Sequence, residues 1–461
     1  MNANLNILGF TVICMEDVVH SQSTNETEEG HWLNDPKKKS VLFSVIAIGQ
    51  LLGTFPIVSL MRIMGMRYTF SIYAILSAIA TLALPLAVEL GHLFLTVIRF
   101  IQGFSVAITI VSFGAVAHSG QLLRSLLPIS PYFPALGAVL VMPVAGVFCE
   151  SLGWRPLYYL FGTIGLLSTA AFFYLYRDDP RKHRMVSAKE LKAITAGKEG
   201  QQERGPVPYM KICKDPCIQA VLLFSLSSIA IYFIFVFFGP TFMNKALGVE
   251  IANTGYLNAL PQALAIALKL IMGPIFDIST FLSMKNRLRV FALLTQGVAA
   301  VCLFVVSQNP GKVLTQVAYC AAGAFNGLNV VAGMKCLQMV ARQHVHFVLV
   351  CVTIGGCVTS FAVPPIVAVV CPNNTVDEWS TLFLGASIFV AISAVPFILL
   401  AKSEPAPWTI STSPSTSNTI QNVTSERIAV QSRATIVPSD SSQSEHNRHA
   451  NVHRISMASE P

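Results

Sequence analysis

An arginine stands inside an apolar run of the sequence. Arg99 lies within Leu95–Ile108, "LTVIRFIQGFSVAI", and Gln102 and Gly103 follow it three and four residues later. A charge in membrane hydrocarbon costs between about 2.5 and about 10 kcal/mol, so it needs a function or a partner. A guanidinium stays charged at physiological pH and binds a carboxylate or a phosphate through two parallel hydrogen bonds. Anion binding is one interpretation; a structural ion pair, or snorkelling to the membrane surface, is the other.

A second charge lies in a later apolar run. Lys269 stands in "LAIALKLIMGPIFD", about two helical turns before Asp277. It is predicted to bring a second positive charge to a substrate cavity, from the half of the chain that does not contain Arg99. The alternatives are a snorkelling lysine or an ion pair with Asp277, although the helix between them spans about 12 Å and strains such a pair.

Uncharged polar side chains interrupt two further apolar runs. Ser228 and Tyr232 lie in "FSLSSIAIYFIF", and Asn326 and Asn329 lie in "AFNGLNVVAG". Ser228, Tyr232 and Asn326 are candidates to line a cavity and to hydrogen-bond a substrate. Hydroxyl groups in membrane helices also bond to the preceding turn, and asparagines can cross-link helices, so a structural role stays open for each.

The sequence contains no recognisable catalytic arrangement. It has no nucleophile–base pair and no phosphate-binding loop, and Cys213 and Cys217 lack the partners of a zinc site. Most of the ten cysteines lie in apolar runs, where they are expected to pack as small hydrophobic side chains and not as a disulfide framework. We therefore predict no enzymatic activity, no bound metal and no cofactor.

The composition is typical of a membrane protein with many spans. Of 461 residues, 53% are hydrophobic and 12% are charged, whereas a soluble domain has about 25% charged residues. The formal charge of +8 does not indicate nucleic-acid binding, because the basic residues cluster in short segments between apolar runs. Such segments are typical of loops at a membrane surface. We therefore expect an all-α protein in a lipid bilayer.

Apolar runs of about membrane length form two sets of six. The first, 1–15, covers only about 22 Å of a hydrocarbon core of about 30 Å. It is either a fraying half-helix or, as we favour, a partial first span whose start is absent from the sequence; it lacks the basic residues of a cleavable signal. The predicted spans are 1–15 (partial), 40–61, 68–90, 93–117, 126–149, 154–176, 217–241, 252–276, 288–307, 314–337, 345–371 and 380–401.

This pattern predicts four parts of the chain. They are an N-terminal helical bundle at 1–176, a linker at 177–216, a C-terminal helical bundle at 217–402 and a tail at 403–461. The linker is rich in Lys and Arg, which places it in the cytoplasm. The tail is rich in Ser and Thr and has too little apolar surface to fold, so we expect it to be disordered.

Positive charges also orient the spans. The short loops on the side of the linker carry more Lys and Arg than the loops on the opposite side, apart from 37–39, which nearby acidic residues offset. Two Asn-x-Ser/Thr sequons, at Asn25 and Asn373, fall on the opposite side, where glycosylation occurs. We therefore predict a glycosylated multi-pass protein of the plasma membrane or of an intracellular vesicle or lysosome.

Two six-span halves joined by a charged cytoplasmic loop resemble the layout of major facilitator transporters, whose substrate site lies at mid-membrane between the halves. Basic loops follow the second and the eighth span, "LMRIMGMRYTF" and "GPIFDISTFLSMKNRLRVF", as an internal repeat requires. In that superfamily such loops pair an Asp at a helix end with arginines of neighbouring helices and so latch one conformation. The resemblance assigns Arg62, Arg67 and Asp277 to this latch, which is weakened because the first loop lacks its own Asp.

Several short stretches, in their order along 40–401, resemble the anion transporters of solute carrier family seventeen, and its nematode branch above all. This group includes sialin, the vesicular glutamate transporters and the type I sodium–phosphate transporters. The stretches are "GQLLGTFP", "VIRFIQG", "AVLVMPVAG", "GWRPLYYLFGTIGLL", "DDPRKH", "VPYMKI", "GYLNALPQ" and "DEWSTLFLGA".

The resemblance implies secondary active transport of a small organic or inorganic anion by alternating access. The driving force would be a proton gradient, a sodium gradient or the membrane potential. The family motif Arg-x-x-Gln-Gly places Arg99 at the central cavity, with Gln102 and Gly103 completing the motif. We expect a monomer whose partners are the solute and the bilayer.

Three positions depart from the family pattern. The carboxylate expected two helical turns after Arg99 is replaced by Val106, a second cavity arginine falls near Ser228, and an acid of the tenth span falls near Gln338. The first loss puts proton coupling in doubt, and the second indicates a substrate that differs from glutamate or is less anionic than glutamate. Two other functions therefore stay open: a sensor or scaffold that does not transport, and a transporter of a neutral or cationic metabolite.

Overall fold

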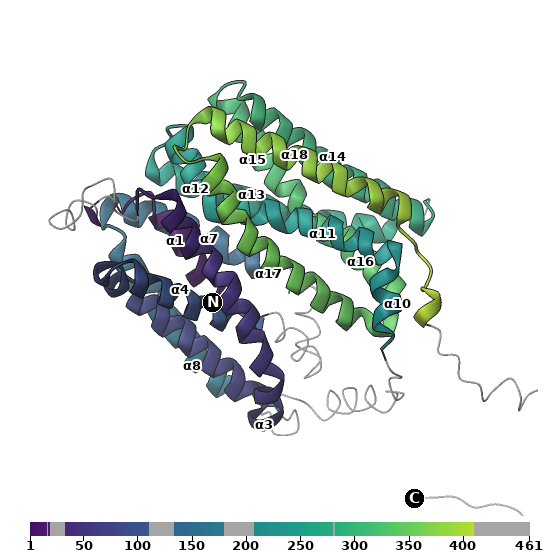
Figure 1. Cartoon of the computed structure of the whole chain (residues 1–461), viewed down its shortest axis with the longest axis horizontal. Helices are drawn as coiled ribbons and strands as arrows, with labels where there is room; N and C mark the ends of the chain where they lie inside the picture. Colours follow the sequence, from purple (N-terminus) through teal and green to yellow (C-terminus); the bar gives the residue numbers. More distant parts are fainter. Residues whose placement is uncertain (16, 19–32, 110–132, 179–206, 280–281, 410–461) are drawn as a thin grey trace, which may run out of the picture. The chain divides into compact units, whose positions relative to one another are not determined.

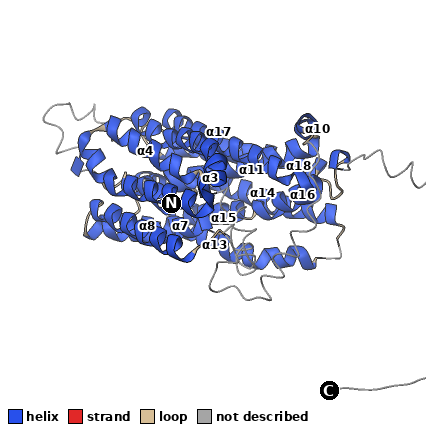
Figure 2. Cartoon of the chain, turned by 90° about the horizontal axis from the view of Figure 1, so that it is seen from below, coloured by secondary structure: helices blue, strands red, loops and turns tan. Residues whose placement is uncertain are grey.

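The computed structural model describes residues 1–15, 17–18, 33–109, 133–178, 207–279 and 282–409, which contain helices and no strand (Figure 2). Within them, Met1–Thr409 form one compact unit. The sequon at Asn25, most of the predicted linker and the tail from residue 410 lie outside the described residues. Their predicted roles are therefore not addressed by the structure.

The N-terminal half supplies five of the described helices (Figure 1). One of them, α3 (Pro36–Leu90), covers two predicted spans. Its backbone kinks between the two spans at Gly65, where φ is 80°. Glycine adopts this left-handed region without the steric cost that a Cβ brings. The helices are α1 (Asn2–Thr11), α3 (Pro36–Leu90), α4 (His92–Val106), α7 (Phe133–Ser151) and α8 (Arg155–Leu175).

The C-terminal half begins with the short α10 (Tyr209–Lys214) and continues with helical structure at each of its six predicted spans. Its first span, from α11 to η5, contains two π-helical turns, and the tenth predicted span is divided between two helices. The elements are α11 (Pro216–Phe233), η4 (Ile234–Phe238), α12 (Gly239–Thr241), η5 (Phe242–Ala246), α13 (Ile251–Ile278), α14 (Met284–Gln308), α15 (Lys312–Gly327), α16 (Asn329–Ala341), η6 (Arg342–His344), α17 (Val345–Val370), α18 (Val376–Leu400) and η7 (Pro407–Thr409).

Polar side chains fix the starts of several helices. Asp35 accepts a hydrogen bond from the backbone N–H of Lys37 at 2.8 Å, and Pro36 takes the first position of α3. Asp215 caps α11 in the same way. These residues satisfy N–H groups that have no partner within the helix, and proline there loses no hydrogen bond. Short polar loops thus stop and restart helices that are otherwise apolar.

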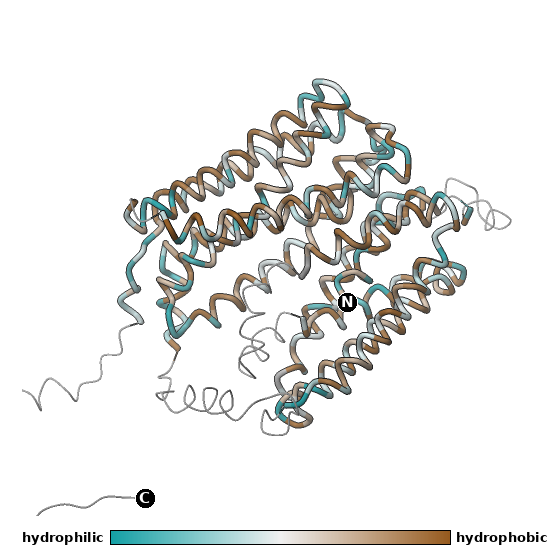
Figure 3. The backbone as a smooth tube through the Cα atoms, turned by 180° about the vertical axis from the view of Figure 1, so that it is seen from behind, coloured by the Kyte–Doolittle hydropathy of each residue, from teal (hydrophilic) through white to brown (hydrophobic). Residues whose placement is uncertain are grey.

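The described helices are those of a multi-pass membrane protein. Eight are long and apolar enough to cross a membrane by length and composition, and His92–Val106 and Ala135–Ser151 are shorter apolar helices. Large apolar side chains remain exposed on them; Ile63 and Val369 are each 79% exposed. Figure 3 shows apolar residues along the helices and hydrophilic ones mainly at their ends. A bilayer covers such a surface, whereas water would not.

Small residues let neighbouring helices approach closely. A Cβ at Gly103 of α4 would overlap the backbone carbonyl of Ile46 in α3. A similar contact joins the two halves, because Gly255 of α13 lies against α7, where its Cβ would come 3.2 Å from the Cα of Gly146. Close backbone approach at small residues is a principal source of helix packing in membranes.

Other contacts between the halves lie on the same side of the membrane as that glycine contact. Ser44 of α3 donates a hydrogen bond to the carbonyl of Phe361 in α17 at 2.9 Å. Phe43 stacks on Phe237 of η4 with ring centroids 5.3 Å apart. The chain direction of α17, which ends just before Asn373, places these contacts toward the Asn373 end of the helices. We call this end the outer end, and the end near Asp277 the inner end.

Two expectations are corrected by the packing. Cys14, beyond α1, and Cys149 of α7 form a disulfide, so these two cysteines do not act as small hydrophobic side chains. The packed chain also continues past the predicted boundary at 402. The backbone N–H of Ala406 donates to the carbonyl of Val340 at 3.1 Å, and Trp408 Nε1 donates to Asp215 Oδ2 at 2.9 Å.

Candidate functional site

Arg99 lies inside the N-terminal half and does not reach the membrane surface. The residue is 0% exposed. Its Nη1 donates to Gln102 Oε1 at 2.8 Å and to the carbonyl of Leu5 in α1 at 3.1 Å, and its Nε lies 3.4 Å from the carbonyl of Leu42 in α3. The snorkelling alternative is therefore excluded for this conformation.

The Arg99 charge has no counter-charge among the described residues. No carboxylate there lies within 4.0 Å of it, and its Nη2 is buried without a hydrogen-bond acceptor. Three neutral oxygens hold the guanidinium in place, while one nitrogen stays free to donate. An unpaired buried charge is costly, and an arriving anion would relieve that cost.

Gln102 acts as the positioning partner of Arg99. Its side-chain oxygen accepts from Arg99, and its Nε2 donates to Thr81 Oγ1 of α3 at 3.2 Å. The two residues are three positions apart on α4, so they share one face of the helix. The sequence predicted Gln102 but gave no sign of Thr81, because only the packing of α3 on α4 brings that hydroxyl to the amide.

The first helix adds a buried polar side chain that sequence reasoning missed. Asn6 is 3% exposed. Asn6 follows Leu5, whose carbonyl binds Arg99. Its side chain also interacts with the hydroxyl of Tyr232 in α11, from the other half of the chain. The sequence signal that could have identified Asn6 is an asparagine inside the short apolar stretch 1–15. Asn6 thus links α1 to Tyr232 of the other half, and the substrate role of Tyr232 stays a prediction.

Ser228 and Asn326 belong to a separate polar cluster inside the C-terminal half. Asn326 Nδ2 donates to the backbone carbonyl of Ser228 at 3.0 Å, and Asn329 Nδ2 donates to Ser228 Oγ at 2.6 Å. Gln296 of α14 contacts the same hydroxyl at 3.4 Å and also donates to Ser227 Oγ at 3.2 Å. The cluster therefore joins α11, α14, α15 and α16, and Gln296 was not predicted from the sequence.

Lys269 lies on another side of α15. It is 8% exposed, and its Cε is 3.8 Å from the position that a Cβ on Gly327 would take. The ammonium group therefore enters the C-terminal half and does not snorkel outward. Asp277 is paired with a different lysine, which removes the predicted Lys269–Asp277 alternative.

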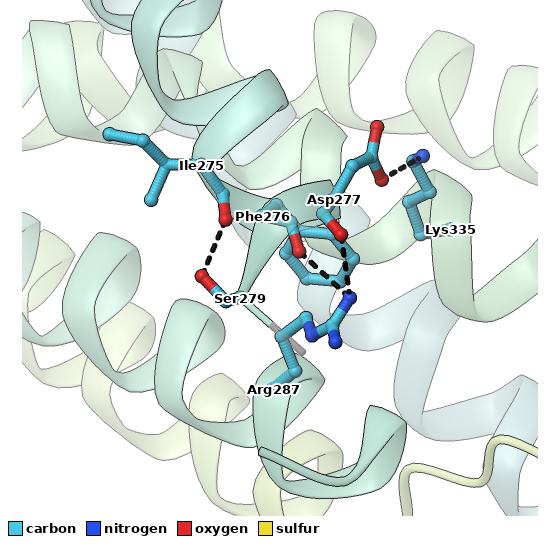
Figure 4. A network of polar contacts seen from close by, with 6 residues as sticks. All are labelled: Ile275, Phe276, Asp277, Ser279, Arg287 and Lys335. Atoms are coloured by element: carbon cyan, nitrogen blue, oxygen red, sulfur yellow. Dashed lines mark hydrogen bonds and ion pairs between the residues drawn. The ribbon is translucent and has the colours of Figure 1, made fainter. Parts of the chain in front are cut away.

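Asp277 is the centre of a network at the inner ends of α13, α14 and α16 (Figure 4). Its Oδ1 lies 2.7 Å from Lys335 Nζ, and both side chains are partly exposed. Arg287 binds the end of the same helix, because its Nη1 donates to the carbonyls of Phe276 at 2.9 Å and of Asp277 at 3.3 Å. The acid at the helix end thus pairs with a lysine of α16, and the arginine caps backbone carbonyls.

The corresponding site in the N-terminal half obtains its acid from elsewhere in the chain. The Asp178 carboxylate, beyond α8, accepts from the backbone N–H of Arg67 at 3.0 Å and would lie 2.5 Å from a Cβ on Gly65. Arg67 Nε donates to the carbonyl of Phe173 at 2.6 Å. Arg62 is exposed, and no interaction of its side chain is seen among the described residues. Neither arginine contacts Asp277.

The remaining predicted positions are not part of the hydrogen-bond networks around Arg99, Ser228 and Asp277. Val106 is buried and Gln338 is exposed. Asn373 is exposed, but its Nδ2 donates to Glu378 Oε1 at 2.9 Å. Its glycosylation therefore stays a prediction.

Comparison with known proteins agrees with this architecture. The family model described as Major Facilitator Superfamily matches residues 31–345. The chain is 26% identical over 400 residues to "Sodium-dependent phosphate transport protein 1" of Oryctolagus cuniculus, covering 81% of this chain and 82% of that protein. It is 27% identical over 349 residues to "Sialin" of Homo sapiens, covering 72% and 69%. The resemblance to solute carrier family seventeen is thus confirmed.

Solved structures show the same fold at low identity. The xylose transporter XylE from E. coli, in an inward open conformation, matches with a TM-score of 0.59 and 12% identity, over 87% of this chain and 98% of that one. A bacterial homologue of the human lysosomal transporter Spinster, inward-facing and occupied, matches with a TM-score of 0.61 and 12% identity, over 87% and 95%. These matches confirm the predicted major facilitator fold.

Proposed function

Because the chain belongs to the Major Facilitator Superfamily, we propose that it is a secondary active transporter of a small organic or inorganic anion. The observation that carries the proposal is the free Nη2 of the fully buried Arg99, in a region without a paired carboxylate. A buried donor without an acceptor matches an anion, because a carboxylate or phosphate offers only acceptor oxygens when ionised.

Alternating access is supported by where the halves touch. The contacts through Gly255, Ser44 and Phe43 lie toward the outer ends of their helices. A transporter of this fold opens on one side while its halves meet on the other. The conformation is therefore assigned to an inward-facing state, in which Arg99 would receive an anion from the cytoplasmic side.

The membrane and the driving ion belong to the same proposal. The named relatives include a sodium-dependent phosphate transporter and sialin. Val106, where the family has a carboxylate, argues against a proton relay at that position and in favour of sodium or membrane potential as the driving force. Either the plasma membrane or a vesicle membrane would supply such a gradient.

The test is uptake into proteoliposomes that contain the full-length chain. Labelled phosphate, glutamate, aspartate, sialic acid and urate are offered under imposed pH, sodium and voltage gradients. Arg99→Ala should lower uptake at least about 30-fold, because losing about 2 kcal/mol of anion binding corresponds to that factor. Arg155→Ala, which removes an exposed arginine paired with Asp17 at 2.7 Å, serves as the control and should transport normally.

Three results would overturn the proposal. Normal uptake by Arg99→Ala would show that the arginine is structural. Saturable anion binding by a folded wild-type protein that never moves the anion would instead establish the sensor or scaffold function. Uptake that anionic competitors leave unchanged would point to a neutral or cationic metabolite.

A further inference from the structure

Two buried oxygens without donors lie next to one hydroxyl group in the C-terminal half. Ser228 Oγ accepts from Asn329 Nδ2 at 2.6 Å and from Gln296 Nε2 at 3.4 Å. The oxygens of the same two amide groups, Asn329 Oδ1 and Gln296 Oε1, are buried and have no hydrogen-bond donor. Asn329 is 3% exposed and Gln296 is 0% exposed. Rotating either amide by half a turn exchanges its oxygen and nitrogen and brings the oxygen to the position beside Ser228 that the nitrogen takes.

Unpartnered acceptors of this kind need an electropositive partner. Leaving one buried acceptor unpaired costs about 1–3 kcal/mol, and two such atoms in one cluster roughly double that cost. Arg99 Nη2 is a buried donor without an acceptor, whereas Gln296 and Asn329 carry buried acceptors without donors. These two polar regions therefore call for partners of opposite charge.

A break in the tenth span brings further oxygen to the cluster. α15 ends at Gly327 and α16 begins at Asn329, so the two asparagines flank the break. Both turn toward Ser228 of α11, and Asn326 Oδ1 lies 3.3 Å from Asn329 Nδ2. Interrupted membrane helices are places where transporters bind coupling ions. Rotating the Asn329 amide by half a turn would place two oxygens at this distance, an arrangement that a cation between them stabilises.

We propose that this cluster is a sodium site. Its ligands are four neutral oxygens: Ser228 Oγ, Gln296 Oε1, Asn326 Oδ1 and Asn329 Oδ1. No carboxylate of the described residues is hydrogen-bonded within the cluster. Calcium and magnesium sites depend on carboxylates, so the neutral set selects a monovalent cation. Lys269 of α13 lies against Gly327 of α15, whereas the asparagines face α11.

A role of this sodium site in transport rests on the proposed function as an anion transporter. A cation in the C-terminal half and an anion at Arg99 in the N-terminal half would offset each other's charge. Closing the halves around both ions would then cost less than closing them around either one. Binding of sodium to the cluster, by contrast, does not depend on any anion.

Thermal unfolding of the purified full-length chain tests the site directly. The protein is heated in NaCl, KCl or choline chloride at equal chloride concentration and without a candidate substrate. Sodium should raise the melting temperature by about 2–4 °C along a single-site binding curve, because a ligand of the folded state stabilises it. Potassium and choline should not. Asn329→Leu and Ser228→Ala should abolish the sodium effect.

Control variants separate this proposal from the anion site. Gln316→Leu changes an amide on α15 outside the cluster and should keep the sodium effect. Arg99→Ala should also keep it, even where uptake is lost. Equal melting in all three salts, or a sodium effect that survives in both Asn329→Leu and Ser228→Ala, overturns the sodium site. Ser228→Ala removes only one atom. If Asn329→Leu does not fold, the melting temperature of Ser228→Ala in sodium therefore tests the site.

Discussion

The backbone N–H of Arg67 donates a hydrogen bond to Asp178 Oδ1 at 3.0 Å, across 111 residues of chain. The carboxylate thus sits at the kink between two spans of α3, where Gly65 leaves room for it. Arg67 also stacks over the Phe173 ring at 4.0 Å and binds its carbonyl. In the other half, Arg289 Nη2 donates to the carbonyl of Leu399 at 3.1 Å. Equivalent helix ends are therefore tied in both halves, as an internal repeat requires.

Replacing this acid should loosen the N-terminal half. Asp178→Ala removes an exposed, charge-assisted hydrogen bond, so it should lower the free energy of unfolding by about 0.5–1 kcal/mol. Gly65→Ala should cost at least about 1 kcal/mol, because alanine is strained at a φ of 80° and its Cβ would meet Asp178. Denaturation in detergent measures both. Glu404→Ala, an exposed acid at the inner end, is the control; equal stability of all three variants would contradict this role for Asp178.

The Asp277–Lys335 ion pair should contribute weakly to stability. The atoms are 2.7 Å apart, but the side chains are 58% and 39% exposed, so water screens the attraction. A double-mutant cycle with Asp277→Ala and Lys335→Ala should give a coupling of about 0.2–1 kcal/mol, which falls as salt is added. If uptake changes in each single variant and recovers when the two charges are exchanged, the pair acts as a latch. Uptake that is insensitive to all of these changes would remove the latch.

The glycine contact between α7 and α13 should control closure of the outer end. A Cβ at Gly255 would come 2.5 Å from the carbonyl oxygen of Met142. Gly255→Ala should therefore push the halves apart there and reduce uptake several-fold, since close contact at small residues is lost. Thiol labelling of cysteines placed near the outer end should increase. Gly385→Ala, where nothing lies within 4 Å, is the matched control. Unchanged labelling in Gly255→Ala would show that this contact does not limit closure.

The disulfide between Cys14 and Cys149 should be detectable in the intact protein. The bond closes a loop of 135 residues and ties α7 to the chain just beyond α1. Both cysteines lie toward the outer end, in contact with an oxidising compartment by the predicted orientation. Reduction should lower stability by about 2–4 kcal/mol. Mass spectrometry of peptides with and without reductant identifies the pair, and Cys149→Ser should expose Cys14 to a thiol reagent. Free thiols at both positions in the unreduced protein would disprove the bond.

Sequence alone determined the fold class and most spans, and it singled out Arg99 as a charge within a span. Hydrocarbon demands long apolar helices and penalises charges, so span positions and a buried arginine can be predicted without knowledge of any contact. The kink in α3 at Gly65 falls in the predicted loop between two spans, whereas the division of the tenth span falls within a stretch that was predicted as one helix. The orientation and the glycosylation of Asn373 stay predictions.

Tertiary structure alone decided which residues act together. Asp178 reaches Arg67, Leu5 reaches Arg99, and Gln296 reaches Ser228 only because helices distant in sequence pack side by side. The same packing paired Asp277 with Lys335 and Cys14 with Cys149. Helical periodicity fixes which face a residue occupies, but the partner of that face depends on how small residues let helices approach. The chemistry of both proposed ion sites arises from that packing.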